Sequence, residues 1–403
     1  MSFIAAFAIA FLQQPAEPPK QEPPKPEPAK LNTKAGSTFT LYGFVRLDVL
    51  YDTSRPNNTQ VPAFIFSEDL SPAGGENDLT IHPRLTRFGL DFDGPTVEEL
   101  GGAKVTGKLE TDFYNLLPAG ATSNSREFVR MRHAWLKLGW ESFSLLVGQR
   151  EDVISPLAPT VNNDLVMWNA GNLGDRRPQI RPEYKVEGFT ATALVGLTGA
   201  LDGSTDAATG FLTGEISAMP TLQLRVGYEF EAFVEKKKVN VGAWAHWAKE
   251  ELDVAVAGED SFNSTAFGLD ITLPIMEQLT VFIEVWTGKN LDDVRGGIAQ
   301  GIVAGEEVAS KGGWIEVHYK VSEVWTPLIG AYLDDPDDSD LLATGVQATH
   351  GRDRNLIFAF GNRFKFGPVT MGADVLFWTT EYVGTGIDDG KDTRFNLFAQ
   401  YNF

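Results

Sequence analysis

Residues 393–403, TRFNLFAQYNF, close the sequence with an alternating pattern that decides the fold. Successive side chains of an extended strand point to opposite faces. One face of this segment carries Thr393, Phe395, Leu397, Ala399, Tyr401 and Phe403. The other face carries Arg394, Asn396, Gln400 and Asn402. Chain ends usually fray into solvent, so a terminal strand with one apolar face needs a partner that holds it.

The same period of two begins at residue 38 and continues nearly to the end of the chain. In residues 38–52, TFTLYGFVRLDVLYD, the odd positions are apolar or glycine and most even positions are polar. Residues 239–247 and 279–286 repeat the pattern. A soluble β-sandwich shows the same alternation, so periodicity predicts an all-β fold without choosing its type.

The lengths of the connections between strands distinguish a β-sandwich from a transmembrane β-barrel. We expect about sixteen strands, near residues 38–52, 84–93, 103–114, 126–139, 143–150, 177–187, 188–198, 222–233, 238–249, 264–274, 278–288, 312–321, 324–333, 354–366, 369–380 and 392–403. Long connections such as 53–83 alternate with short ones such as 366–368. Short periplasmic turns and long extracellular loops are typical of transmembrane barrels. The sequence therefore predicts a transmembrane antiparallel β-barrel, whose last strand pairs with its first.

Three segments fit this pattern with difficulty. In RMRHAWLKLGW, a regular strand would place the charged Arg130 and Arg132 on the same face as the apolar Ala134. A β-bulge near residue 133 is therefore required to move them to opposite faces. Pro182 lies inside an expected strand, where it removes a ladder hydrogen bond. Residues 210–219 also resemble a strand, but counting them makes the strand number odd. We therefore assign 210–219 to a loop.

Composition excludes several classes of protein. The 403 residues contain no cysteine, so disulfides and thiolate chemistry are absent. A net charge of -20 argues against nucleic acid as a partner. The histidines lie in no HExxH spacing, and no G-x-S-x-G or P-loop motif is present. We therefore expect no cofactor, no metal site and no enzymatic activity, although a site assembled only in space escapes a motif search.

The chain divides into three regions. Residues 1–12 contain a short apolar run that predicts a signal peptide, with cleavage after Ala10, although the usual positive charge before it is missing. Residues 13–35 are rich in proline, lysine and glutamate, and we interpret them as a periplasmic linker, either an inert tether or a spacer into the cell wall. Residues 36–403 form the expected outer-membrane barrel. No other apolar run is long enough to cross a bilayer as a helix.

Several motifs resemble the DcaP-like branch of the bacterial outer-membrane porins. They are LYGFVRLDVLYD, LLVGQREDVISPL, GNLGDRRPQIRPEY and GAYLDDPDDSD, and the final AQYNF resembles the signal that the barrel assembly machinery reads. The resemblance covers most of residues 38–403 and departs at the amino end, where the family commonly carries a helical coiled coil. It implies a sixteen-stranded homotrimer that passes small solutes, often anions or dicarboxylates. Tyr401 and Phe403 are then the expected assembly signal.

Charged side chains recur on the polar phase of the strands. We expect the following residues to line the pore: Arg46, Arg87, Arg130, Arg132, Arg176, Arg177, Arg181, Arg225, Arg363, Arg394, Asp48, Asp112 and Glu284. Mixed charge is ordinary in a water-filled lumen, where ion pairs stiffen the wall. The alternative is a transverse field in which arginines guide anions. A run of aspartates at 334–340 offers oxygen ligands for calcium but lacks EF-hand spacing, and a solvated loop explains it more simply.

The connection at 151–176 is among the longest in the chain, and by resemblance to porins it folds into the lumen as a constriction loop. It ends in Asp175, Arg176 and Arg177, and Arg181 follows on the lumen phase. Guanidinium groups stay charged and bind carboxylates at two points, so this cluster is expected to favour small anions. Pairing of Arg176 with Asp175, which anchors the loop, is the competing interpretation.

The sequence thus predicts a passive diffusion porin for small hydrophilic solutes in the bacterial outer membrane. Its expected partners are outer-membrane lipid, the barrel assembly machinery and small anionic solutes, with a homotrimer implied by the resemblance. A barrel-embedded enzyme and a structural or adhesive barrel with a closed lumen are the two alternatives.

Overall fold

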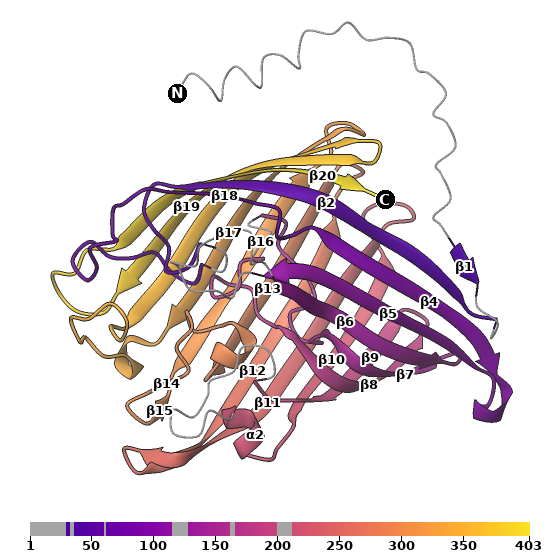
Figure 1. The fold of residues 1–403 in the computed structure, drawn as a ribbon, viewed down its shortest axis with the longest axis horizontal. Helices are drawn as coiled ribbons and strands as arrows, with labels where there is room; N and C mark the ends of the chain where they lie inside the picture. Colours follow the sequence, from indigo (N-terminus) through magenta and orange to yellow (C-terminus); the bar gives the residue numbers. More distant parts are fainter. Residues whose placement is uncertain (1–29, 33–35, 60–61, 115–127, 162–165, 200–211) are drawn as a thin grey trace, which may run out of the picture.

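The alternating segments form one closed antiparallel β-barrel (Figure 1). The computed structural model describes residues 30–32, 36–59, 62–114, 128–161, 166–199 and 212–403. The expected signal peptide and all of the expected linker except β1 (Lys30–Asn32) lie outside the described residues. Within the described part of the chain, no helix has the length and apolar character needed to cross a membrane.

Sixteen strands build the barrel wall, since β1 and β3 (Asp78–His82) join the 18-stranded sheet only by pairing with β2. The wall strands are β2 (Thr38–Asp52), β4 (Arg87–Val97), β5 (Ala103–Tyr114), β6 (Phe128–Gly139), β7 (Phe143–Glu151), β8 (Arg176–Val186), β9 (Phe189–Gly196), β10 (Thr221–Glu231), β11 (Lys238–Val256), β12 (Glu259–Pro274), β13 (Leu279–Lys289), β16 (Ala309–Tyr319), β17 (Trp325–Pro336), β18 (Arg352–Phe366), β19 (Val369–Tyr382) and β20 (Gly390–Asn402). The predicted number and order of strands are confirmed.

The remaining elements are short and belong to connections. They are the hairpin of β14 (Ile302–Val303) and β15 (Glu306–Glu307), the helix α2 (Thr213–Ile216), and the 3-10 turns η1 (Glu98–Leu100), η2 (Asp292–Val294) and η3 (Asp338–Asp340). The segment 212–219, which contains α2, is therefore part of a loop, as predicted.

The two ends of the chain close the barrel. β20 pairs with β2 from Phe44 opposite Asn402 to Asp52 opposite Arg394. Beyond this ladder, the backbone groups of Gly43 and Phe403 exchange hydrogen bonds of 3.2 and 3.0 Å. β2 and β20 lie side by side in Figure 1. Closure explains the amphipathic terminal strand, because it leaves no strand edge unpaired.

Short and long connections lie at opposite ends of the barrel, as expected. The exception is the β11–β12 hairpin, where the ladder continues to Val256 opposite Glu259. The predicted strand ends at 249 and 264 are therefore wrong. Residues 249–253, KEELD, carry the charges of a loop, but antiparallel pairing continues into them: Glu250 lies opposite Phe262 and Glu251 opposite Ser261, and the register shifts between Glu251 and Val256.

The two strand irregularities that the sequence predicts, at residue 133 and at Pro182, are both present. The first is a β-bulge and the second is an interrupted ladder. The register of β5 and β6 shifts between Glu110 and Thr111, which leaves Arg132 without an opposite residue and confirms the bulge near 133. Pro182 lies opposite Leu145 of β7, and its ladder with β9 is interrupted between Ile180 and Glu183. The interruption matches the hydrogen bond that proline cannot donate.

The two faces of the wall differ in polarity. Outward-facing positions such as Leu47, Phe267 and Val285 are large, apolar and exposed, with about half or more of each side chain accessible. Inward-facing positions such as Asp270 and Glu284 are polar and buried. This is the arrangement of a barrel whose outer face meets acyl chains.

Placing a charge on the outer face is expected to destabilise the barrel. Val285 lies near the middle of β13 and is 48% exposed, so an arginine there meets hydrocarbon. We expect Val285→Arg to lower the free energy of unfolding by about 2 to 4 kcal/mol. The matched control is Lys289→Arg at the end of the same strand, which keeps a charge that the native chain already carries. Reversible unfolding in lipid vesicles measures both, and equal stabilities contradict the assignment of the outer face.

Candidate functional site

The connection between β7 and β8 lies inside the barrel. Its first half, residues 152–161, is held by carboxylates of the opposite wall. The backbone N–H of Leu157 donates to Glu284 Oε1 at 2.8 Å, and that of Thr160 donates to Glu316 Oε1 at 2.9 Å. Arg363 donates to the carbonyl of Thr160. The loop therefore crosses the lumen and rests on β13, β16 and β18.

The second half of the loop, residues 166–175, packs on the same wall. Trp286 Nε1 donates to the carbonyl of Gly171 at 2.7 Å, and Asn355 Nδ2 donates to the carbonyl of Asn169 at 2.7 Å. Loop residues Val161, Met167 and Ala170 join the main apolar cluster together with Trp314, Tyr332, Ile357 and Trp378. Apolar packing and buried hydrogen bonds thus fix the loop, and they offset the strain of positive φ angles at residues such as Met167.

A second loop, residues 290–308, braces the first. The N–H of Asn169 donates to the carbonyl of Arg295 at 2.7 Å, and that of Gly174 donates to the carbonyl of Val294 at 2.8 Å. The Arg295 guanidinium pairs with Asp175 at 2.8 Å. Burial raises the pKa of Asp175, but Arg295 and Arg176 outweigh it, so the pKa lies below its ordinary value. The stabilising effect of this charge is present above pH about 4 and is lost on further acidification.

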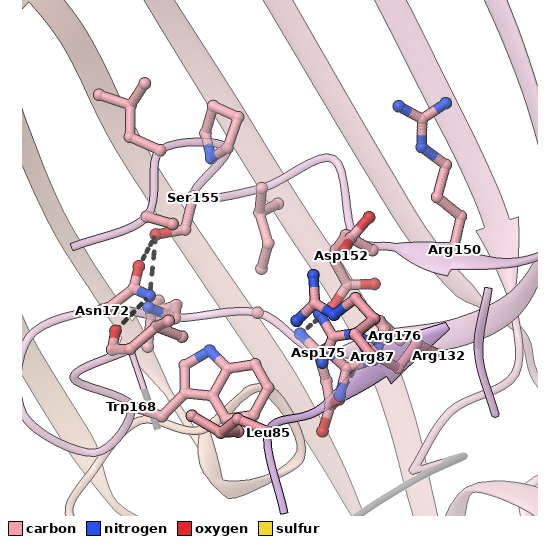
Figure 2. Close-up of a pocket in the computed structure, with 18 of the residues that line it drawn as sticks. Leu85, Arg87, Arg132, Arg150, Asp152, Ser155, Trp168, Asn172, Asp175 and Arg176 are labelled. Carbon is pink, nitrogen blue, oxygen red and sulfur yellow. Dashed lines mark hydrogen bonds between the residues drawn. The ribbon is translucent and has the colours of Figure 1, made fainter. Parts of the chain in front are cut away.

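Between the loop and the wall lies a cavity of about 600 Å³. Loop residues Ile154, Pro156, Leu157, Trp168 and Leu173 form much of one side. The other side is basic and carries Arg46, Arg87, Arg130, Arg132, Arg150, Arg176 and Arg181. Figure 2 shows Arg87, Arg132 and Arg176 close together, with Arg150 on the neighbouring strand end. One side of the cavity is therefore largely apolar and the other is rich in arginine.

Four of these arginines are paired with carboxylates of the wall. Arg130 bonds Asp112 at 2.7 Å, and Arg132 lies 2.8 Å from Glu110 and 3.0 Å from Asp112. Arg87 lies 3.5 Å from Glu110. In a separate pair, Arg46 bonds Asp48 at 2.6 Å. These pairs largely neutralise one another and stiffen the wall, which is the ordinary role of mixed charge in a lumen.

The other three arginines have no carboxylate within salt-bridge distance among the residues that the structure describes. Arg176 lies 5.7 Å from the ring of Trp168, and Arg150 lies 5.4 Å from the ring of Trp135. Arg181 donates to the backbone carbonyl of Glu151 at 3.3 Å. We call Arg150, Arg176 and Arg181 the uncompensated arginines. Pairing of Arg176 with Asp175 does not occur, because Asp175 pairs with Arg295 instead.

The acidic residues of the cavity lining do not cancel these charges. Asp152 bonds Arg177 at 2.6 Å, and Asp175 bonds Arg295 as described above. Glu151 lies 2.9 Å from His133 Nε2. Each of these three carboxylates thus pairs with a residue other than the uncompensated arginines. The cavity therefore keeps an excess of positive charge.

The remaining residues predicted to line the pore lie away from this cavity. Arg177 is 2% exposed and holds Asp152 beneath the loop. Arg225 bonds Asp270 at 2.6 Å, and Arg363 bonds Asp374 at 2.5 Å. Full burial separates the last four from the cavity. Arg394 lies 3.6 Å from Asp52, and Glu284 is covered by the loop. Asp48 pairs with Arg46, and Asp112 pairs with Arg130 and Arg132. Arg150 was not among the residues predicted to line the pore, although it lies near the end of β7 and faces the lumen.

Phe403 and Tyr401 lie on the outer face at the closing seam. Their side chains are 43% and 53% exposed, and the Phe403 ring centroid lies 5.9 Å from that of Phe88. Among the described residues, no group of three or more His, Asp or Glu side chains is arranged to hold a metal ion, and the aspartate run at 334–340 forms no such group. In that run, Asp337 caps η3 by accepting from the N–H of Ser339.

No family model and no curated protein matches the chain. Solved structures do. The outer membrane channel DcaP of Acinetobacter baumannii superposes with a TM-score of 0.72 at 20% identity, covering 93% of this chain and 100% of that one. The anion-selective porin from Comamonas acidovorans gives 0.58 at 12% identity, covering 91% and 100%. OmpF of Salmonella typhi gives 0.60 at 13% identity, covering 93% and 100%. The chain therefore has the fold of outer-membrane channels and porins.

Releasing the loop 152–175 from the opposite wall is expected to change the ionic current through the barrel. Glu284 is buried and accepts from Leu157 N, Trp314 Nε1 and Ser155 Oγ, so Glu284→Ala leaves these donors unpaired. Each buried hydrogen bond of this kind contributes about 0.5 to 1.5 kcal/mol. We expect a lower melting temperature and a noisier, larger single-channel current. Glu316→Ala, which frees Thr160 in the same way, is expected to act in the same direction; unchanged currents in both variants contradict loop anchoring.

Proposed function

We propose that this protein is a porin of the bacterial outer membrane that passes small hydrophilic solutes by diffusion and prefers anions. The fold supports the first part, since DcaP is described as an outer membrane channel and the Comamonas acidovorans protein as an anion-selective porin. The uncompensated arginines support the second part. They face a cavity of about 600 Å³ and have no carboxylate partner among the described residues.

The preference has a simple electrostatic origin. A unit charge about 4 Å away in water changes the energy of an ion by about 1 kcal/mol, which is roughly a fivefold change in local concentration. Three uncompensated guanidinium groups therefore favour anions over cations at the cavity even though the whole chain carries a net charge of -20. Clefts lined by charge of one sign focus the field in this way.

The assembly of the protein is part of the proposal. The exposed apolar outer face fits outer-membrane lipid and the flat contacts of a homotrimer, the state that one neighbour, OmpT of Vibrio cholerae, is described as having. The terminal Phe403 at the closing seam fits recognition by the barrel assembly machinery. Small carboxylates fit the arginine-rich side of the cavity, because guanidinium groups bind carboxylates at two points.

Planar bilayer recording tests the channel directly. Purified protein is added to one side of a bilayer in KCl, and stepwise current increments are expected as single barrels insert. A structural or adhesive barrel with a closed lumen gives no increments. A barrel-embedded enzyme is recognised separately, because hydrolysis of phospholipid or ester substrates by the same preparation reveals it without any current. Absence of increments at high protein concentration contradicts the proposed function.

A further inference from the structure

A cluster of buried oxygen atoms lies at the long-loop end of the barrel, apart from the arginine cavity. Glu250 projects from β11, Asn290 directly follows β13, and Asp293 lies in η2 of the loop 290–308. Their side chains are 0%, 0% and 2% exposed. We call Glu250, Asn290 and Asp293 the rim cluster. It joins a wall strand to the loop that braces the constriction.

The acceptors of the rim cluster exceed its donors. Asn290 Nδ2 donates to Glu250 Oε2 at 3.1 Å, which satisfies one carboxylate oxygen. The other oxygen of Glu250, both carboxylate oxygens of Asp293 and the amide oxygen of Asn290 are buried and have no hydrogen-bond donor among the described residues. The carboxyl groups of Glu250 and Asp293 nevertheless lie within hydrogen-bonding reach of each other. Two acceptor-only groups in contact repel each other unless a positive species lies between them.

Among the residues that the structure describes, no lysine or arginine side chain bonds these carboxylate oxygens. Arg177 is the basic side chain that comes nearest in the hydrogen-bond network, and its Nη2 reaches only the backbone carbonyl of Asp293 at 3.5 Å. Its other contacts go to Asp152, to the carbonyl of Leu197 and to Thr221. A single shared proton satisfies two oxygens and leaves the other two without a partner. A cation that binds several oxygens satisfies all of them.

A glycine of the same loop packs directly against the cluster. A Cβ on Gly301 would lie 2.4 Å from the amide oxygen of Asn290 and 2.2 Å from a carboxylate oxygen of Asp292, which follows Leu291 in the same loop. That oxygen of Asp292 also accepts from the N–H of Asp293 at 3.1 Å. The oxygens of Asn290 and Asp292 therefore lie against the Cα of Gly301, and any side chain at position 301 would displace them.

We propose that the rim cluster binds one calcium ion. Carboxylate and amide oxygens are the ligands that hard divalent cations prefer, and the cluster offers no nitrogen or sulfur ligand that favours zinc or copper. Two carboxylates are too few for a high-affinity site, so backbone or water oxygens complete the shell. The expected dissociation constant is in the range of about 10⁻⁴ to 10⁻³ M, which is typical of extracellular calcium sites.

The ion would brace the constriction from behind. Asp293 is followed by Val294 and Arg295, whose backbone and side-chain groups hold Gly174, Asn169 and Asp175 of the constriction loop. Calcium binding at the rim cluster therefore fixes the support on which the constriction rests. This inference is independent of the proposed anion preference, because it concerns the stability of the loop 290–308.

Calcium titration of the full-length protein in detergent tests the proposal. After treatment with EDTA and its removal, isothermal calorimetry is expected to detect about one calcium ion per chain. The test variant is Glu250→Gln with Asp293→Asn, which keeps side-chain size and removes two charges. The control is Glu98→Gln with Glu99→Gln, which removes two exposed charges from η1, on a short turn. Only the test variant is expected to lose affinity, by about tenfold or more, because two anionic ligands are gone.

Thermal unfolding separates this result from a folding defect. A ligand that binds only the folded state raises its melting temperature. Calcium is expected to raise the melting temperature of the wild type and of the control variant, but not of the test variant. In EDTA the test variant is expected to be at least as stable as the wild type, because repulsion between the two carboxylates is gone. Equal calcium binding by the wild type and the test variant, or a wild type that calcium neither binds nor stabilises, overturns the proposal.

Discussion

Deletion of Phe403 is expected to reduce the level of folded protein in the outer membrane by about tenfold or more, since the closing seam of the barrel depends on the last residues. The backbone of Phe403 exchanges two hydrogen bonds with Gly43, and its ring lies 5.9 Å from that of Phe88. The ring is 43% exposed and faces outward, where an assembly factor can reach it. Heat-modifiable mobility on gels of outer-membrane fractions measures the folded protein.

Two substitutions separate recognition from stability. Phe403→Tyr keeps an aromatic ring and is expected to assemble normally, whereas Phe403→Asn removes the ring and keeps the backbone hydrogen bonds. If the ring is the assembly signal, the asparagine variant refolds into detergent micelles in vitro as well as the wild type and yet is depleted from the membrane. Normal outer-membrane levels of the deletion variant contradict both the seam and the signal.

The barrel could be predicted from the sequence because each strand shows by itself which of its faces meets lipid and which meets water. An outer face in lipid and an inner face in water impose a period of two on every strand, and residues such as Val45 and Phe395 follow it. Closure also follows, because a strand edge in lipid is too costly to leave unpaired. The β11–β12 hairpin was underestimated because its outer part pairs through charged residues, and the sequence gives no signal that separates this from a loop.

The cavity was predicted only in part because it depends on contacts between distant segments. Arg176 and Arg177 are adjacent in the sequence and equally basic. In the structure, Arg177 pairs with Asp152 beneath the loop, whereas Arg176 lines the cavity. Arg150 was missed because β7 carries apolar residues on both faces, including the inward-facing Leu146, which hides the lumen phase. Period-two patterns assign a side chain to a face, but they do not show which side chains a folded loop covers.

Replacing the uncompensated arginines is expected to remove the preference for anions. The variant Arg150→Gln, Arg176→Gln, Arg181→Gln keeps polar side chains that fit the cavity and removes three charges that have no carboxylate partner among the described residues. At roughly fivefold per charge, the loss of three charges is large enough to make the cavity neutral or cation-preferring. The four paired arginines share three carboxylates, Asp48, Glu110 and Asp112, so this set keeps at most one unbalanced positive charge.

The control removes the same charge from a distant part of the barrel. Lys236→Gln, Lys237→Gln, Lys238→Gln changes exposed lysines at the β10–β11 turn, where each contacts a carboxylate at the surface. This control is expected to leave ion preference unchanged, because charges separated by more than the Debye length of about 10 Å at 0.1 M salt are screened. It separates the local field of the cavity from the net charge of the chain.

The reversal potential of the wild-type channel in a KCl gradient is the most direct measurement of the central claim. With the uncompensated arginines in place, its sign is expected to show that chloride crosses more readily than potassium. The triple-glutamine variant is expected to shift the reversal potential to zero or to the opposite sign, and the lysine control is expected to match the wild type. A wild-type channel that prefers potassium, or one whose ion preference is the same in the triple-glutamine variant, contradicts the account.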